Sequence, residues 1–283
     1  MLTLNLLEPA ASAIAFERFL FPDGQPHITI KTESLPDHRE SCRIITRMAN
    51  ANDVLLALLV HQTLSTLGFE RIELVISYLT GARMDRVMTN GEPFSLKVIA
   101  GIINMAGFHK VAVFDPHSNV STALLNRSHA IDNTRFVSDA IQNDQARFPA
   151  GNWCLVSPDA GALKKVHDVA QVIGAGHVVE CLKTRDVKTG KLSGFKVFDG
   201  DLAGKTCYIA DDICDGGGTF IGIAGQLRKH NAGRVVLIVS HGIFSKGFSL
   251  AGIDAIYTTD SFRTFDSVHD SLTVLPVMTY LTR

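Results

Sequence analysis

Carboxylates and glycines lie close together in one stretch of the sequence. Asp211 and Asp212 follow an apolar run at 207–210, and a third aspartate then precedes a run of glycines and a threonine. Successive glycines let backbone N–H groups converge on an anion, and a threonine hydroxyl can donate one more hydrogen bond. The carboxylates would repel a phosphate, so they suit either sugar hydroxyls, as acceptors, or a divalent cation, as ligands. The predicted sugar-phosphate site consists of Asp211, Asp212, Asp215, Gly216, Gly217, Gly218 and Thr219.

The segments on either side of this stretch predict how it is positioned. The run 207–210 contains aromatic and β-branched residues, which is typical of a buried strand in a parallel sheet. Apolar residues from 221 to 227 have the spacing of an amphipathic helix. The stretch is therefore expected at the carboxyl end of a strand, where open α/β sheets bind ligands. The alternative is a glycine-rich turn flanked by solvated acids. The pattern is neither a Walker A loop nor G-x-G-x-x-G.

Composition limits the classes of protein to which the chain can belong. Its 283 residues suffice for two α/β domains, and a net charge of −1 gives no electrostatic case for nucleic acid or a membrane as a partner. Glu8 and Glu17, with no basic region, argue against a signal peptide. The 5 cysteines are dispersed without a C-x-x-C pair, which predicts reduced thiols in a cytoplasmic protein. Cys214 lies inside the glycine-rich stretch, where we expect it to be a spectator.

Several motifs, in order along the chain, resemble those of one enzyme family. Residues 208–219 resemble the loop that binds phosphoribosyl pyrophosphate (PRPP) in type I phosphoribosyltransferases and in ribose-phosphate pyrophosphokinases, the PRPP synthetases. YLTGARMDR at 78–86, with EPFSLK at 92–97, resembles the ATP-binding segment of the pyrophosphokinases, which ordinary phosphoribosyltransferases lack. The other motifs are FPDGQ at 21–25, VFDPHS at 113–118 and SPDAG at 157–161. The resemblance to the pyrophosphokinases covers the chain from residue 21 to about residue 262.

The resemblance implies a fold and a reaction. The fold is α/β, with two phosphoribosyltransferase-like domains that are each a mainly parallel sheet flanked by helices. Residues 1–146 would bind ATP, and residues 147–283 would bind ribose phosphate. The implied reaction transfers the β,γ-diphosphoryl group of ATP, with Mg²⁺ as cofactor, to the 1-hydroxyl of ribose 5-phosphate, giving PRPP and AMP. An adenine contact shared between subunits implies a homo-oligomer, at least a dimer.

The same resemblance assigns roles to particular residues. Lys183 and Arg185 occupy the K-x-R positions of the family's catalytic loop, in a polar flap at 183–194, although such a hairpin seen alone would favour simple solubility. His117 and Asp159 would hold the metal. The residues that would contact ATP are Phe21, Asp23, Gln25, Arg83, Met84, Asp85 and His117.

Three positions depart from the family pattern. Gln25 stands in place of a glutamate and Met84 in place of a glutamine, which alters two adenine contacts. Gly216 stands in place of a threonine, so that a side-chain hydroxyl contact to phosphate is lost. Two other functions stay open: a phosphoribosyltransferase that consumes PRPP and a base, and a non-catalytic regulatory homologue of the pyrophosphokinases.

Local patterns also predict individual helices. Residues 50–53, with the sequence NAND, can cap a helix whose apolar face carries Leu55, Leu58, Leu59 and Leu64. Residues 10–20 and 119–152 are expected to be helical, and 147–152 to form a hinge between the domains.

Overall fold

The chain folds into two compact units, which are described separately here. The computed structural model describes residues 1–149, 151–185, 192–265 and 269–281, and at 34, 183–185, 192 and 193 it describes the backbone alone. Among the described residues, the first unit comprises Met1–Asp132 with Leu281, and the second comprises Asn133–Tyr280. The division falls earlier than the predicted boundary between 146 and 147, because the helix at 134–147 packs within the second unit.

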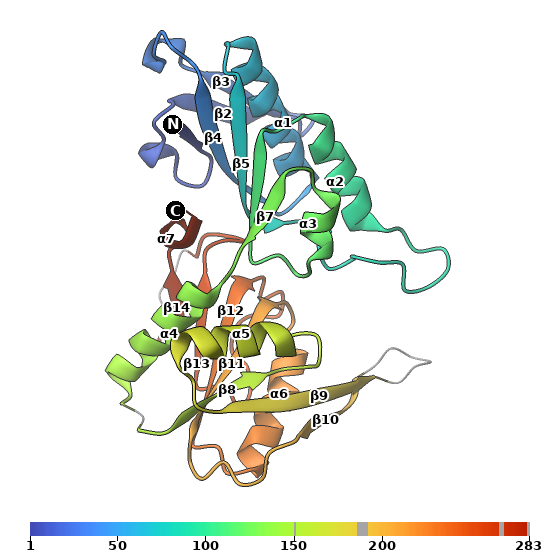
Figure 1. The fold of residues 1–283 in the computed structure, drawn as a ribbon, viewed down its shortest axis with the longest axis vertical. Helices are drawn as coiled ribbons and strands as arrows, with labels where there is room; N and C mark the ends of the chain where they lie inside the picture. Colours follow the sequence, from blue (N-terminus) through green and yellow to red (C-terminus); the bar gives the residue numbers. More distant parts are fainter. Residues whose placement is uncertain (150, 186–191, 266–268, 282–283) are drawn as a thin grey trace. The chain divides into compact units, whose positions relative to one another are not determined.

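The first unit is built on a parallel sheet with the strand order β1-β4-β5-β6-β7 (Figure 1). A separate antiparallel hairpin, β2–β3, lies along α1. Apolar residues predominate in the buried strands, as in the run LVI at 74–76. The elements are β1 (Leu2–Asn5), η1 (Pro9–Ala11), β2 (Phe16–Leu20), β3 (Pro26–Ile30), η2 (Thr32–Ser34), β4 (Ser41–Met48), α1 (Ala51–Thr66), β5 (Arg71–Leu79), α2 (Ser95–Met105), β6 (Lys110–Phe114), α3 (Val120–Leu124) and β7 (Ser128–Ile131).

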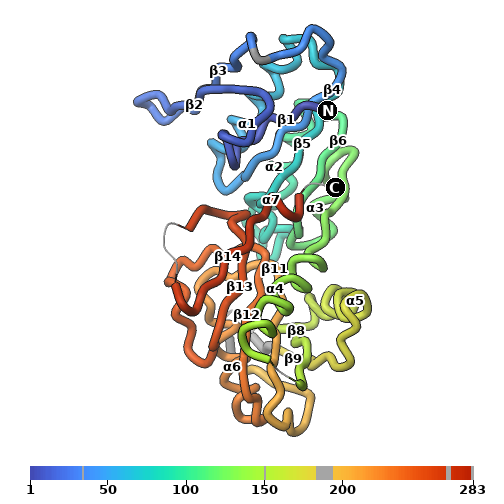
Figure 2. Tube along the Cα trace, turned by 90° about the vertical axis from the view of Figure 1, so that its left-hand side faces the viewer, coloured from blue at the N-terminus to red at the C-terminus, as the bar shows by residue number. Residues whose placement is uncertain are grey.

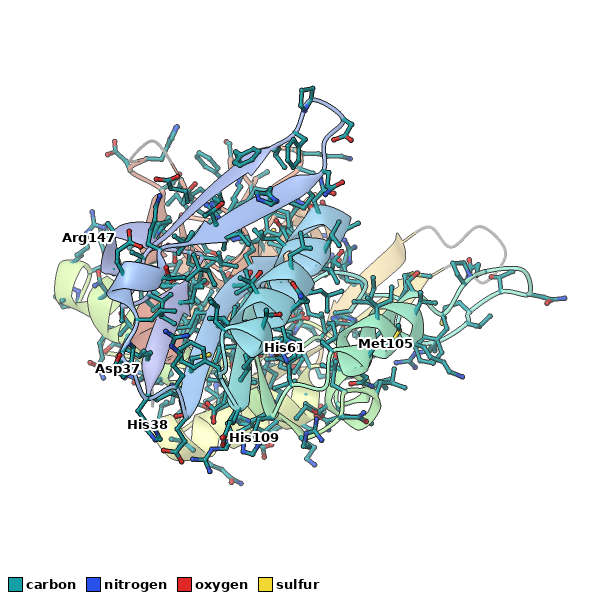
Figure 3. The ribbon with its side chains drawn as sticks, turned by 90° about the horizontal axis from the view of Figure 1, so that it is seen from above. Asp37, His38, His61, Met105, His109 and Arg147 are labelled. Carbon is teal, nitrogen blue, oxygen red and sulfur yellow. The ribbon has the colours of Figure 1, made fainter. Side chains whose placement is uncertain are left out.

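Helix α1 begins with the predicted cap. The Asn50 side chain accepts a hydrogen bond from the Asp53 backbone N–H at 3.1 Å, and the Asp53 carboxylate accepts one from the Asn50 N–H at 3.1 Å. This reciprocal arrangement is a capping box. Further along α1 lies His61, which Figure 3 labels. Its ring meets Phe108 edge-on with centroids 4.5 Å apart, and burial lowers the pKa of His61. The capping box thus defines the start of α1, and His61 packs the helix against the residue two positions before β6.

The second unit has a larger sheet with the strand order β10-β9-β8-β11-β12-β13-β14. Its strands pair in parallel except for the antiparallel β9–β10 hairpin. Helix α6 covers one face of this sheet, and α4 and α5 cover the other (Figure 2). The elements are α4 (Thr134–Arg147), β8 (Trp153–Ser157), α5 (Leu163–Ile173), β9 (Val178–Arg185), β10 (Leu192–Val197), β11 (Thr206–Cys214), α6 (Gly218–Lys229), β12 (Arg234–Gly242), β13 (Ala255–Thr259), β14 (Leu272–Leu275) and α7 (Met278–Leu281).

Two helix predictions were wrong. Residues 10–20 form a short 3-10 helix and strand β2, because Phe16–Leu20 pairs with Pro26–Ile30 in a hairpin. Residues 119–152 contain α3, strand β7 and α4 in place of one long helix, because Ser128–Ile131 joins the edge of the first sheet beside β6. The predicted fold class, mainly parallel sheets flanked by helices, is confirmed.

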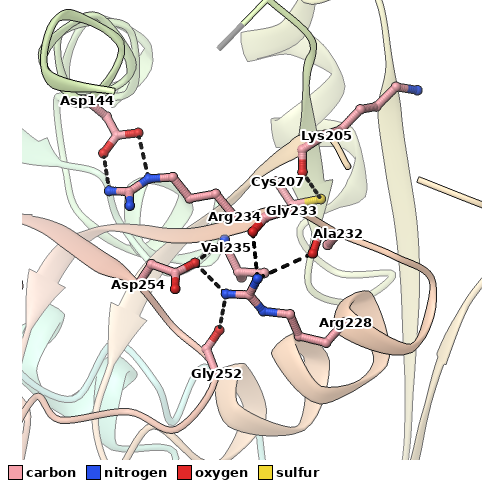
Figure 4. A network of polar contacts seen from close by, with 10 residues as sticks. All are labelled: Asp144, Lys205, Cys207, Arg228, Ala232, Gly233, Arg234, Val235, Gly252 and Asp254. Carbon is pink, nitrogen blue, oxygen red and sulfur yellow. Dashed lines mark hydrogen bonds and ion pairs between the residues drawn. The ribbon is translucent and has the colours of Figure 1, made fainter. Parts of the chain in front are cut away.

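Polar contacts tie the helices of the second unit to its sheet (Figure 4). Asp254 accepts a hydrogen bond from the Val235 backbone N–H at 2.7 Å and pairs with Arg228 at the end of α6. Arg228 also donates to the Gly233 carbonyl at 2.7 Å. The turn between α6 and β12 is thereby held at both ends.

Within the described residues, no helix is long and apolar enough to cross a membrane.

Candidate functional site

The two adjacent aspartates lie inside strand β11, not beyond it. We predicted that the strand would end at 210, but its pairing with β12 continues through Asp211, opposite Val239, to Cys214, opposite Gly242. Asp212 is buried, and its backbone N–H donates to a carboxylate oxygen of Asp211 at 2.9 Å. Both side chains are therefore fixed by the sheet at the edge where strands β8 and β12 also end.

The electrostatics of this pair are unusual. Burial, followed by the neighbouring Asp212 carboxylate, raises the pKa of Asp211 well above its ordinary value. The charge of Lys165, on α5, acts in the opposite direction. Two carboxylates held side by side in this way suit a ligand that donates hydrogen bonds or carries positive charge, such as a sugar diol or a cation.

The glycine-rich loop connects β11 to α6. Gly217 is the N-cap of α6 and has a left-handed φ of 73°, and a Cβ there would lie 2.4 Å from Leu250 Cδ2. Only glycine fits this position, both for conformation and for space. Gly218 and Thr219 form the first turn of α6, whose free N–H groups and dipole favour an anion. The carboxylates, the glycines and the helix N-terminus therefore follow one another in the structure in the predicted order.

Asp159 lies after β8, the strand that pairs with β11 in the same sheet. Its carboxylate oxygen Oδ1 accepts hydrogen bonds from the backbone N–H groups of Gly161 and Ala162, at 3.0 and 3.1 Å. The Ser157 hydroxyl donates to the Asp159 carbonyl at 2.9 Å. These bonds hold Asp159 at the carboxyl edge of the sheet that also carries Asp211.

Lys183 and Arg185 belong to strand β9, opposite Phe195 and Leu192 of β10. Their backbone follows Glu180, the last residue of β9 that pairs with β8, so it continues beyond the end of β8. Their side chains lie outside the described residues, as does the part of the predicted flap at 186–191.

In the first unit, the structure brings together two of the predicted ATP-binding segments. Asp85 is buried and forms a two-point ion pair with Arg86, with distances of 2.7 and 3.1 Å. This pair lowers the pKa of Asp85, with smaller contributions from Ser118 and His117, which follow β6. Arg83 and His117 are exposed, whereas Met84 is half-buried and donates its backbone N–H to the Gly81 carbonyl at 3.0 Å.

The remaining predicted ATP-binding residues form the tip of the β2–β3 hairpin. The Gln25 backbone N–H donates to the Asp23 carboxylate at 3.1 Å, and the Phe21 N–H donates to the Gln25 carbonyl at 2.9 Å. Asn52 of α1 donates to the Gly24 carbonyl at 3.0 Å and so anchors the tip. The Phe21 side chain is 40% exposed.

Sequence reasoning missed two groups at the carboxyl edge of the second sheet. Lys165 acts on Asp211, and the Ser245 hydroxyl donates to Asp215 at 2.5 Å. Lys165 could have been suspected because it follows SPDAGA at the start of a helix. Ser245 gave no such signal, because it reaches the loop only through the pairing of β11 with β12.

Comparison with known proteins gives the same fold. No family model matches the chain. The crystal structure of a phosphoribosylpyrophosphate synthetase from Mycobacterium smegmatis resembles this structure with a TM-score of 0.78 at 21% identity, covering 96% of this chain and 89% of that one. The architecture is therefore that of a phosphoribosylpyrophosphate synthetase, which agrees with the predicted phosphoribosyltransferase-like domains.

Curated relatives identify the family to which the chain belongs. A ribose-phosphate pyrophosphokinase of Pyrococcus abyssi is 31% identical over 231 residues, covering 80% of this chain and 76% of the relative. Another, from Corynebacterium efficiens, is 29% identical over 222 residues, covering 76% of this chain and 66% of the relative. The chain belongs to the ribose-phosphate pyrophosphokinase family, as its motifs predicted. It spans about two thirds of the second relative and about three quarters of the first.

Proposed function

We propose that the chain is a ribose-phosphate diphosphokinase, which transfers the β,γ-diphosphoryl group of ATP to the 1-hydroxyl of ribose 5-phosphate and releases AMP. Membership in the pyrophosphokinase family carries this proposal. The junction of β11, the glycine loop and α6 supports it, because it combines acceptors for a sugar with donors for a phosphate.

On the sugar side, Asp211 and Asp212 would accept hydrogen bonds from ribose hydroxyls, with Asp215 at the mouth of the loop. The backbone N–H groups from Gly216 to Thr219 would hold the 5-phosphate at the N-terminus of α6. Because Asp211 and Asp212 are held by strand pairing, they would need little rearrangement when the sugar binds.

On the nucleotide side, the hairpin tip with Phe21, Asp23 and Gln25 would contact adenine. Arg83, Met84, Asp85 and His117 would face ATP from the loops after β5 and β6. Lys183 and Arg185 would offset the charge that develops on the transferred group, as preorganised cations do in phosphoryl transfer.

We further propose Mg²⁺ as the cofactor, with Asp159 and His117 each as a ligand. Carboxylate oxygen is the donor that Mg²⁺ prefers, and the loop at Asp159 presents such a group in a fixed orientation. The ion would neutralise part of the polyphosphate charge. Among the described residues, no group of 3 or more His, Cys, Asp or Glu is arranged to hold a metal by itself.

Assembly and location complete the proposal. An adenine contact supplied by a neighbouring hairpin requires a homo-oligomer of at least two chains, which light scattering after gel filtration would detect. The exposed aromatic and aliphatic side chains of that hairpin, Phe19, Leu20 and Phe21, support this assignment. All 5 cysteines are free and buried, in keeping with a reducing compartment, and we propose the cytoplasm.

The decisive experiment is an assay of AMP release with ATP, Mg²⁺ and ribose 5-phosphate. Wild type should form AMP only when ribose 5-phosphate is present, and Lys183→Ala should lose at least about a hundredfold in rate. The matched control is Lys196→Ala, which removes a lysine of the adjacent strand whose ammonium lies 5.1 Å from the Phe198 ring centroid. That variant should keep the wild-type rate.

The other outcomes separate the alternatives. Binding of ATP without AMP formation by wild type would favour the non-catalytic regulatory homologue. Consumption of PRPP together with a free base would favour a phosphoribosyltransferase. Equal losses in Lys183→Ala and Lys196→Ala would mean that the hairpin is needed for folding and would remove the support for a catalytic Lys183.

A further inference from the structure

A lysine that the motifs do not include lies against the glycine loop. A Cβ built on Gly216 would lie 3.5, 3.6 and 3.8 Å from Cδ, Cε and Cγ of Lys246. The methylene chain of Lys246 therefore runs in van der Waals contact with the volume that a side chain at 216 would occupy. With a C–N bond of roughly 1.5 Å, the ammonium group stays within about 5 Å of that point.

Backbone conformation does not require glycine at 216. The left-handed glycine of the loop is Gly217, whereas Gly216 is not among the glycines with positive φ in the described residues. A residue with a side chain could adopt this backbone conformation at 216. The effect of glycine here is therefore that it leaves the side-chain volume free. In this chain, Lys246 covers that space.

Lys246 is held at the loop by a constrained turn. The backbone N–H groups of Ile243 and Phe244 both donate to the carbonyl of Cys214, the last residue of β11, at 2.9 and 3.1 Å. Phe244 has a left-handed φ of 49° yet is buried, and the Gly247 N–H donates to its carbonyl at 2.9 Å. Such strain persists only where surrounding contacts enforce it.

The neighbouring residue ties the same turn to the acidic end of the loop. The Ser245 hydroxyl donates to Asp215 at 2.5 Å, which joins the residue before Lys246 to the residue before Gly216. The position of Lys246 relative to the glycine loop is thus fixed from two directions.

The positive charge of Lys246 is the property that matters at this position. Asp211, Asp212 and Asp215 precede Gly216 within a few residues, and a phosphate group bound at α6 would be repelled by them. A lysine ammonium is a compact cation well suited to phosphate oxygens. Lys246 itself is exposed, and the structure gives it no carboxylate partner among the residues that it describes.

We propose that Lys246 is a phosphate-binding residue of this site, whose ammonium group supplies the contact that a hydroxyl side chain at 216 would otherwise make. The proposal rests on the proposed function, because it takes ribose 5-phosphate as the ligand of the glycine loop. It assigns to this chain a cationic contact to the 5-phosphate in place of a neutral one.

The test compares the binding of ribose 5-phosphate, by isothermal titration calorimetry, to wild type, Lys246→Met and Lys246→Arg. Lys246→Met keeps the contact with the loop and removes the charge, so Kd should rise about tenfold, while Lys246→Arg should stay near wild type. The control is Lys229→Met at the exposed end of α6, which should not change Kd. In the AMP assay, Lys246→Met should raise KM for ribose 5-phosphate more than it lowers kcat.

A second variant separates the phosphate contact from packing. In Lys246→Ala combined with Gly216→Thr, the new hydroxyl should recover part of the affinity that Lys246→Ala alone loses. An unchanged Kd and KM in Lys246→Met, with wild type active, would overturn the role of Lys246 and leave the proposed function intact.

Failure of the proposed function gives a different pattern. If wild type neither binds ribose 5-phosphate nor forms AMP, the same variants are compared by protection against thermal unfolding with inorganic phosphate. Protection of wild type that is lost in Lys246→Met would still support a phosphate-binding Lys246. Equal protection of both proteins, or of neither, would overturn it.

Discussion

The guanidinium of Arg234 lies 2.9 Å from a carboxylate oxygen of Asp144, whose side chain is completely buried. The hydroxyls of Tyr208 and Tyr257 donate to the same carboxylate, at 3.1 and 3.3 Å. The guanidinium carbon of Arg234 also lies over the Phe148 ring, 3.9 Å from the ring centroid. Helix α4 is thus joined to strands β11, β12 and β13, which places it in the second unit.

Removal of Asp144 should destabilise the second unit strongly. Asp144→Ala leaves a largely buried guanidinium and two buried hydroxyls without their acceptor, and we expect a loss of about 3–5 kcal/mol in the free energy of unfolding. Urea denaturation followed by circular dichroism measures this. Asp168→Ala is the control, because Asp168 is exposed on α5, and it should cost less than about 1 kcal/mol. Similar losses in both variants would contradict the assigned importance of the buried network.

Asp211 should make the fold less stable at neutral pH. Burial and the neighbouring Asp212 raise its pKa above the ordinary value of 3.8, so the folded state binds the proton more tightly than the unfolded state. The contribution of Asp211 to the stability of the fold is therefore greatest below pH 3.8. It falls as the pH rises through the raised pKa of the folded state.

Asp211→Asn should therefore raise the urea midpoint at neutral pH and flatten the pH dependence above pH 3.8, while it weakens sugar binding. The midpoint is measured at a series of pH values for both proteins. A lower midpoint for Asp211→Asn at neutral pH would show that the charged carboxylate stabilises the fold, contrary to this prediction.

Two glycines of helix α6 should respond in opposite ways to alanine. A Cβ at Gly222 would lie 2.0 Å from the Phe195 ring, so Gly222→Ala should cost about 1–3 kcal/mol through overpacking. Gly225 has no atom within 4 Å of such a Cβ, so Gly225→Ala should stabilise the helix by roughly 0.5–1 kcal/mol. The melting temperatures of the two variants, measured by thermal unfolding, test this prediction. Equal shifts in melting temperature would mean that β10 moves freely away from α6.

Cys214 should be chemically inert in the folded protein despite its place beside the glycine loop. Burial, reinforced by the charges of Asp211 and Asp215, raises its pKa to about 12. At about pH 8 the thiolate fraction is then on the order of 10⁻⁴, so alkylation should be about a thousandfold slower than for an ordinary thiol. Mass spectrometry after timed iodoacetamide treatment measures this, with denatured protein as the control. Rapid labelling of native Cys214 would contradict it.

Local chemistry in the sequence was sufficient to predict the glycine junction and the N-terminal cap of α1. The positive φ of Gly217 and the reciprocal bonds of Asn50 and Asp53 depend on residues within a few positions. The full length of β11 was not predictable in this way, because its last residues are strand only through their pairing with His241 and Gly242. The boundary between the units was missed for a similar reason, since the partners of Asp144 lie far along the chain.

The hairpin shows the same limit of local reasoning. Phe16–Leu20 contains residues that fit either a helix or a strand, and the partner strand at Pro26–Ile30 decided the outcome. Lys183 and Arg185 illustrate the opposite case. Their proposed roles come from a motif, and the structure adds only the position of their backbone on β9.

Gly242 and Phe244 share one volume at the end of β12. A Cβ at 242 would lie 2.2 Å from the Phe244 ring, which fills that space from a strained left-handed backbone. Substitutions at positions 242 and 244 are therefore expected to be correlated among relatives. A relative that carries a side chain at 242 must carry a smaller residue at 244 and must also make room at Thr258, whose hydroxyl oxygen would lie 2.8 Å from the same Cβ. Such a relative can then relax the turn that presents Lys246. Covariation of 242, 244 and 246 is the pattern expected if this corner of the protein is inherited as a single unit.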